Sequence, residues 1–432
     1  MSSERKGIVN FLQEFSIPLI AGVFVALAVA NLFPEAYHHI VDGELTHATI
    51  FGHHITLHFL VNDIFMVLFF GIAAKEIVEA ALPGGSLNPI RKAMNPLMGT
   101  VGGVVGPVGV FFAIIMLTSS MYPAEQAELT GRGWGIPTAT DIALAWLVAR
   151  TVFGRGHPAI NFLLLLAVAD DAIGLVIIAV FYGDPSHPAH PEYLGLVAAA
   201  MALAFAMRKM GVKTWVPYIV FAGPLAWGGL ILANLHPALA LVFVVPFLPG
   251  PKRDTGMFNE QDEAAQALAA GHAAESSALH EFEHQLKLFV DFGLFFFAFA
   301  NAGVEFAGIG PMTWTILASL IVGKTVGITL LSVLADKIGL SLPDGMGIKE
   351  LIVAGFIAAL GLTVALFVAA AAFPMNAELL GQAKMGALFS GFVGLAAILL
   401  GKMLGLGGSR VPEAQASSSK ADPEETRTRQ AG

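Results

Sequence analysis

Apolar segments, each about the length a helix needs to cross a bilayer, recur along the whole chain. Short polar stretches separate them, and breaks at "AGPLAW" and "ANLHPALA" divide the longest apolar region into two. The pattern therefore predicts an all-α membrane protein with about twelve transmembrane helices. The predicted segments cover residues 16–34, 59–79, 96–117, 134–150, 158–182, 193–207, 214–231, 233–248, 285–306, 312–335, 348–372 and 383–404.

The positive charges alternate from loop to loop. Loops 35–58 and 183–192 hold no Lys or Arg, and the exceptions to the alternation are Arg132 and Lys384. Because cytoplasmic loops carry an excess of Lys and Arg, both termini are predicted to be cytoplasmic. The basic residues stand before the first segment and after each even-numbered one, at Arg5, Lys6, Arg91, Lys92, Arg150, Arg155, Arg208, Lys209, Lys213, Lys252, Arg253, Lys337, Lys349, Lys402 and Arg410.

The segments between 16 and 405 form the predicted transmembrane domain. Residues 1–15 are a polar cytoplasmic N-terminus without a removable signal, 249–284 a cytoplasmic loop, and 406–432 a disordered cytoplasmic tail. On the outside, residues 47–59 alternate polar and apolar positions around a glycine, which predicts a β-hairpin. Its edge strand would allow pairing with a second copy, and hence a homodimer.

Composition narrows the function classes. Hydrophobic residues make up 56% of the chain and charged residues 13%, whereas soluble domains carry about 25% charged residues. Cysteine is absent, which excludes disulfides, thiolate metal sites and cysteine catalysis. The expected environment is the lipid bilayer, and we expect no cofactor and no nucleic-acid partner.

A few ionisable residues stand inside the apolar segments. Each costs about 2.5–3.5 kcal/mol at a helix centre, and such residues usually mark ion or proton pathways. A buried ion pair explains Lys75 and Asp291 equally well. The three acids of the fourth and fifth segments, together with Lys324, exceed what pairing between helices needs. The full set is Asp63, Lys75, Glu76, Asp141, Asp170, Asp171, Asp291 and Lys324.

Two apolar segments contain residues that interrupt a helix. "GRGWGIPTATDIALAW" places three glycines, a proline and two threonines before Asp141, and "GFIAALGLTVALF" is a milder case in segment 348–372. Both are middle members of a triplet, which predicts inverted-topology repeats with two discontinuous helices. Asp141 is placed to balance two helix N-termini and Lys324 to balance two C-termini.

Asp170 and Asp171 are neighbours on one helix and point about 100° apart. One is expected to face a cavity and the other to lean towards Lys324. Two buried acids resist simultaneous ionisation, and a nearby cation favours it. A proton and a small hard cation such as Na⁺ or Li⁺ would therefore compete for Asp171 and Asp170, assisted by Thr140 and the backbone of 138–141.

The stretches "GIPTATDIALA", "LAVADDAIGLVIIAVFY", "FFFAFANAGV" and "VGKTVGITL" closely resemble the NhaA family of sodium/proton antiporters over residues 10–405. The resemblance implies that the two discontinuous helices cross. It makes Asp171 the cation-binding acid, Asp170 the partner of Lys324 in the ion-free state, and Thr140 and Asp141 the pair in the unwound fourth helix.

The resemblance also assigns pH sensing to Glu283 and His284 in "FEHQ", and to Glu76 in the second segment. The chain departs from the family there, because Lys75 precedes Glu76 and the Lys-Arg-Glu run is missing, and Lys287 replaces a further family histidine. These departures put the pH response in question and leave the transport residues untouched.

The implied function is not enzymatic. It is the electrogenic exchange of one intracellular Na⁺ or Li⁺ for two external H⁺ in the bacterial inner membrane, with regulation by pH. A sodium-coupled organic-solute symporter of the same fold is the alternative, and it would need an additional polar, aromatic-lined pocket. An intramembrane aspartyl protease fits poorly, because its two acids would stand on separate helices.

Overall fold

The computed structural model describes residues 16–83, 85–88, 90–154, 156–183, 190–250 and 277–406. The predicted N-terminal region, most of the loop 249–284 and nearly all of the tail lie outside these residues. Seven described helices are long and apolar enough to cross a membrane, and an eighth span results if Gln126–Thr138 and Ile142–Phe153, bent by 50°, are counted together.

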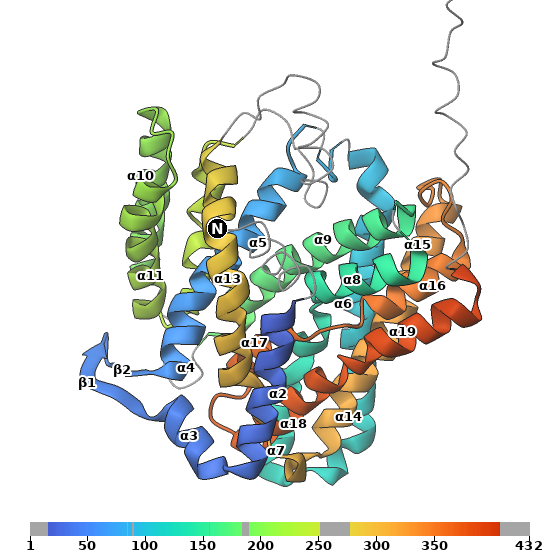
Figure 1. Cartoon of the computed structure of the whole chain (residues 1–432), viewed down its shortest axis with the longest axis horizontal. Coiled ribbons are helices and arrows are strands. Elements are labelled where there is room, and N and C mark those ends of the chain that lie inside the picture. The colour runs from blue at the N-terminus through green and yellow to red at the C-terminus, as the bar shows by residue number, and fades with distance from the viewer. Residues whose placement is uncertain are drawn as a thin grey trace, which may run out of the picture.

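The described chain is built almost entirely of helices (Figure 1). The long apolar helices of its first half are α2 (Ile17–Leu32), α5 (Met66–Ala80), α6 (Ile90–Thr118), α8 (Ile142–Phe153), α9 (Pro158–Phe181), α10 (Leu194–Lys209) and α11 (Gly223–Leu232). The second half holds α13 (Ala278–Ala302), α14 (Pro311–Ala318), α15 (Thr325–Lys337), α16 (Ile348–Ile357), α17 (Thr363–Ala372), α18 (Ala377–Phe389) and α19 (Phe392–Met403).

Among the predicted segments, 233–248 differs from the structure in kind and 285–306 in extent. The segment 233–248 is not one long helix but two short 3₁₀-helices, η6 (Pro237–Val242) and η7 (Val245–Phe247). Prolines interrupt the α-helical hydrogen bonds there, and Asn234 adopts a left-handed turn with φ 57°. Helix α13 begins seven residues before the predicted apolar segment 285–306, because Ser277 caps it and its first two turns are polar.

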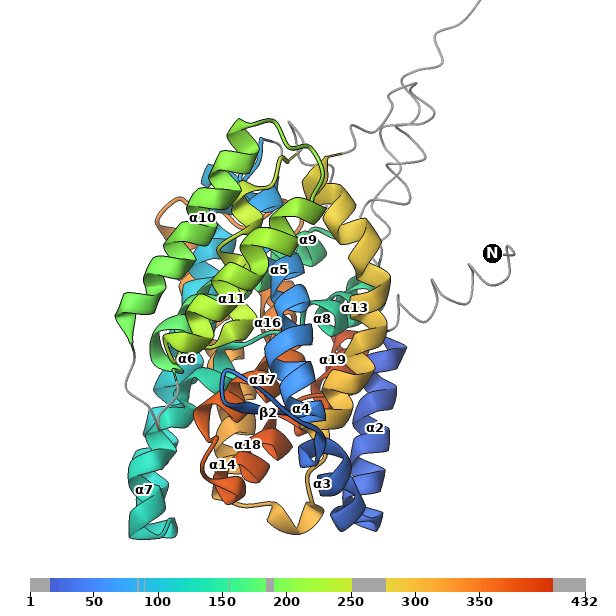
Figure 2. The same ribbon diagram turned by 90° about the vertical axis from the view of Figure 1, so that its left-hand side faces the viewer.

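A short antiparallel hairpin, β1 (Glu44–Ile50) and β2 (His53–Thr56), follows α3 (Pro34–Asp42). Its two-residue turn, Phe51–Gly52, has positive φ at both positions, as the tight hairpin turns that match strand twist require. The hairpin and α3 lie towards the same end of the bundle as α7 (Ala124–Thr130), the lower end in Figures 1 and 2. The chain segments predicted to face outside therefore gather at one end.

Helices α6 and α15 are in very close contact. A Cβ atom at Gly102 would overlap the carbonyl of Gly327, so the two backbones touch where no side chain intervenes. Large apolar side chains remain exposed on the outward surfaces of the bundle, among them Phe24, Leu117 and Met403. An apolar surface of this extent is typical of a protein that lies in lipid.

Candidate functional site

The two helix breaks predicted from the sequence meet inside the bundle. One separates η3 (Gly131–Thr138) from α8, and the other separates α16 from α17. The backbone N–H of Asp141 donates to the carbonyl of Leu360 at 2.6 Å, which joins the breaks directly. Each break leaves unpaired backbone groups that have no water to bond in a membrane, so they satisfy one another here.

Asp141 lies at the start of two helices at once. Its Oδ1 accepts from the backbone N–H of Leu144 at 3.1 Å, which caps α8. Its Oδ2 accepts from the hydroxyl of Thr363 at 3.0 Å and from the Thr363 N–H at 3.4 Å, at the first residue of α17. A carboxylate in this position opposes the positive ends of both helix dipoles.

The far end of α17 is also held by the broken fourth segment. Arg132, an exception to the loop-charge alternation, donates from Nε to the carbonyl of Ala372 at 3.0 Å. Ala372 is the last residue of α17, where the helix dipole is negative. The Tyr182 hydroxyl accepts from Gly135 N–H at 2.9 Å and donates to the Arg132 carbonyl at 2.7 Å, which ties η3 to α9.

Lys324 forms the centre of a buried polar cluster. Its Nζ donates to Asp170 Oδ2 at 2.7 Å and to Thr140 Oγ1 at 2.6 Å, and the Lys324 and Asp170 side chains are 0% exposed. Lys324 ends a π-helical segment, η9 (Ser319–Lys324), between α14 and α15. Such irregular turns recur at functional sites because they redirect single side chains.

Thr140 connects this cluster to the second helix break. Its hydroxyl lies 2.8 Å from Asp170 Oδ2 and 3.0 Å from the carbonyl of Ala358, just beyond the C-terminus of α16. The hydroxyl carries one proton, so it donates to one of these oxygens at a time while it accepts from Lys324. Thr140 therefore connects the Lys324 ammonium to the C-terminal end of α16, where the helix dipole is negative. The sequence predicted that Lys324 balances helix ends of this kind.

Asp171 takes no part in the ion pair of its neighbour Asp170. Its side chain is partly exposed, and the buried Oδ1 has no hydrogen-bond partner within the described residues. The charges of Glu76, Asp170, Asp141 and Lys324 all act on this carboxyl group. A carboxylate oxygen without a partner, close to three other acids and one amine, is suited to take up a cation or a proton.

A second group of charged residues lies between α5 and α13, and of the residues predicted to sense pH it includes Glu283. Lys75 forms ion pairs with Glu79 at 2.6 Å and with Glu283, and Lys287 contacts Glu283 at 3.2 Å. Glu76 interacts electrostatically with these side chains and also with Asp171. His284 is exposed and lies beside His280. Glu76 therefore lies electrostatically between the ion-pair group and the central acids.

Several contacts were not foreseen from the sequence. Thr363 was noted only as part of a break, although it hydrogen-bonds Asp141. The sequence did contain an indication of this role, because Thr363 follows glycines that interrupt its segment, as Thr138 does in the other interrupted segment. The role of Glu283 as a partner of Lys75 was also missed, since 208 residues separate the two in sequence.

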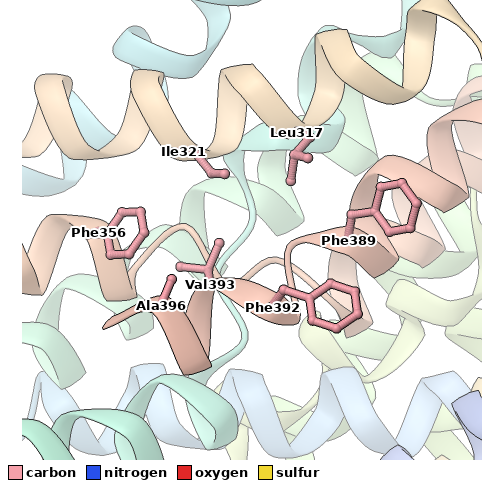
Figure 3. Close-up of a pocket in the computed structure, with 7 residues that line it drawn as sticks. All are labelled: Leu317, Ile321, Phe356, Phe389, Phe392, Val393 and Ala396. Carbon is pink, nitrogen blue, oxygen red and sulfur yellow. The ribbon is translucent and has the colours of Figure 1, made fainter. Parts of the chain in front are cut away.

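An apolar groove elsewhere in the bundle does not belong to this site. Figure 3 shows its lining side chains, with α14 and η9 on one side and α16, α18 and α19 on the other. No ionisable side chain lines it: the lining residues are Leu317, Ile321, Phe356, Phe389, Phe392, Val393 and Ala396. It is apolar surface of the kind that lipid covers.

Comparison with known proteins places the chain among transporters. A profile of the family described as Na⁺/H⁺ antiporter 1 matches residues 9–404. The protein named Na⁺/H⁺ antiporter NhaA of Desulfitobacterium hafniense (strain DSM 10664 / DCB-2) is 55% identical over 417 residues, covering 96% of this chain and 100% of its own. The NhaA of Geobacter sulfurreducens is 54% identical over 404 residues, covering 94% and 99%.

A solved structure shares the fold. The sodium proton antiporter MjNhaP1 from Methanocaldococcus jannaschii superposes with a TM-score of 0.50 and covers 91% of each chain at 12% sequence identity. At that identity the likeness concerns fold alone. Together with the long apolar helices, these relatives identify an integral membrane protein.

Proposed function

Because the chain belongs to the Na⁺/H⁺ antiporter 1 family, we propose that it exchanges cytoplasmic Na⁺ or Li⁺ for external H⁺ by alternating access. The observation that supports this most directly is the unpartnered Oδ1 of Asp171 next to the buried Asp170–Lys324 pair. Na⁺ and H⁺ would occupy the same carboxylates at different times, and this mutual exclusion couples their movements.

In the proposed cycle, the deprotonated carboxylate of Asp171 takes the cation from the cytoplasmic side. Asp170 becomes a further oxygen ligand when Lys324 leaves it, and the Thr140 hydroxyl and the backbone carbonyls of residues 138–141 complete the set. The loaded site then opens to the outside by movement of one helix bundle against the other. External protons displace the cation and return with the carboxylates.

The proposed stoichiometry is two protons for each cation, which moves one net positive charge inward in each cycle. A membrane potential of 100 mV then contributes about 2.3 kcal/mol to each turnover. Under a potential that is negative inside, Na⁺ leaves the cell and H⁺ enters it, which serves pH homeostasis. Glu76, Glu283 and His284 are proposed to set the pH at which the cycle runs.

The proposed membrane topology has twelve spans in the bacterial inner membrane, with both termini cytoplasmic. Inverted repeats with crossed discontinuous helices are part of this proposal, and the contact between Asp141 and Leu360 at the two breaks supports it. A homodimer through the hairpin β1–β2 is proposed from its exposed edge.

Asp171→Asn in everted vesicles tests the function. Na⁺ added to acidified vesicles normally releases protons, and a pH-sensitive dye reports this as dequenching. The variant is expected to abolish the signal with Na⁺ and with Li⁺, because an amide cannot alternate between a proton and a cation. Asp344→Asn, at an exposed position, is the matched control. Unchanged exchange in Asp171→Asn would refute the assignment, and a signal that requires an added organic solute would favour the symporter.

A further inference from the structure

A second polar network lies at the end of the bundle that carries the hairpin. His58 of α4 (Leu57–Phe59) and Asn62 of η1 (Leu60–Phe65) precede α5, and Asn301 lies near the end of α13. His58 Nε2 is 2.8 Å from Asn62 Nδ2. Asn62 and Asn301 are buried and form a reciprocal pair of amide hydrogen bonds, at 2.8 and 3.3 Å.

The hydrogen bonds fix the orientation of both amides. Asn301 Nδ2 donates to the carbonyl of Phe297 at 3.1 Å, so its nitrogen cannot be exchanged for its oxygen. Asn62 must therefore present its oxygen to Asn301 Nδ2, which turns the Asn62 NH₂ group towards His58. An amide nitrogen only donates, so His58 Nε2 accepts and the imidazole is neutral in this arrangement.

We propose that His58 is an external proton-binding site that releases the Asn62–Asn301 bridge when it is charged. A proton from the external solution binds the lone pair of His58 Nε2 and leaves N–H groups on both ring nitrogens. The new Nε2–H then faces the Asn62 NH₂, so two donors oppose each other. Asn62 turns its oxygen towards His58 and gives up its reciprocal bonds with Asn301.

The largest influence on His58 is burial, which disfavours a charged ring, so the ring becomes charged only in a more acid solution than an ordinary imidazole needs. The side chain is partly exposed, so solution protons reach it. Lys384 repels a positive charge on the ring and Asp42 attracts one, while His236 interacts with His58 electrostatically. The charged and titratable groups that act on it are Asp42 on α3, His236 before η6 and Lys384 on α18. Asp63 on η1 lies 3.9 Å from His236, and His53 on β2 stacks on Phe59.

The bridge joins the same two helices as the Lys75–Glu283 ion pair, at their opposite ends. Asn62 and Lys75 are separated by about 20 Å along the helix, at 1.5 Å for each residue. Release of the outer bridge frees the external end of α5 from α13 while the inner ion pair holds. External acid would thereby promote the outward opening through which protons enter. This inference rests on the proposed function, because the outside of the membrane is assigned there.

His58→Gln tests the proposal, because glutamine offers an acceptor oxygen to Asn62 and takes up no proton. In everted vesicles the lumen bathes the external face, so lumen pH is set during loading and isotopic Na⁺ uptake is measured at fixed outer pH. Relative to wild type, the variant should match at a lumen pH of about 8 and be several-fold slower at about 4.5, because burial and Lys384 keep this ring neutral to a more acid pH than an ordinary imidazole. The uptake rate of the variant should depend on the outer pH in the same way as that of wild type. His47→Gln, an exposed histidine of the hairpin, is the control.

Two results would overturn the proposal: a lumen-pH dependence equal to that of wild type, or equal shifts on both faces. Hydrogen exchange gives a reading that needs no transport. Between about pH 7.5 and 4.5, after correction for intrinsic exchange, the segments 57–65 and 297–302 should lose protection in wild type and keep it in His58→Gln. Equal protection in both proteins would reject the switch, even if exchange activity itself proved absent.

Discussion

Removal of the Lys324 ammonium provides the most quantitative test of the central cluster. Lys324 and Asp170 are fully buried and their charged atoms are 2.7 Å apart. Lys324→Met keeps the volume of the side chain and leaves Asp170 without its cation. Loss of one partner of a buried ion pair typically lowers stability by about 3–5 kcal/mol. We expect about 3 kcal/mol here, because Thr140 still donates to Asp170.

The double variant Lys324→Met/Asp170→Asn separates the charge from the packing. It removes the uncompensated carboxylate, so it should recover most of the loss and lie within roughly 1 kcal/mol of wild type. The two substitutions are then non-additive by about 2 kcal/mol or more, as expected for groups in contact. Both variants should lack exchange activity, so recovered stability cannot come from recovered function.

Denaturant titration of the purified protein in detergent, followed by tryptophan fluorescence, measures these differences. Lys402→Met, at the exposed end of α19, controls for the loss of a lysine in general. A Lys324→Met variant as stable as wild type would show that the pair contributes nothing. A double variant less stable than the single one would show that packing, not charge, holds the cluster together.

Two other predictions concern residues near the breaks and near the start of α13. Asp141→Ala removes the caps of α8 and α17, each worth about 1 kcal/mol, so the free energy of unfolding should fall by roughly 2 kcal/mol; an unchanged value would deny the double cap. Replacement of Glu283 and His284 together by glutamine should shift the pH profile of exchange along the pH axis. If exchange activity measured in vesicles depends on pH as it does in wild type, the result would count against their role as pH sensors.

The sequence predicted best where a residue type conflicted with its surroundings. Charged residues in an apolar run stand out, and Asp141, Asp170, Asp171 and Lys324 do meet inside the bundle. The clustered glycines, proline and threonines before Asp141 likewise marked a real interruption. In both cases the signal is local, because the chain itself carries the unfavourable group and the structure has to compensate for it.

Pairings between distant parts of the chain were harder to predict. Nothing near Lys75 indicates that its partner is Glu283, and nothing near Asn62 points to Asn301. Helix limits failed for a related reason: polar turns such as the start of α13 continue a helix beyond its apolar part. A hydropathy pattern detects lipid exposure, whereas these features depend on what packs against the chain from elsewhere.

The capping of α17 at both ends has a mechanical consequence. Asp141 holds its first residue and Arg132 its last, and both belong to the short stretch 132–141. A tilt of α17 would therefore move η3 as well, because hydrogen bonds at both ends of α17 connect it to the stretch that contains η3. In the proposed cycle, α17 and η3 would therefore move together within their bundle, and a substitution at Arg132 would alter transport without touching an ion.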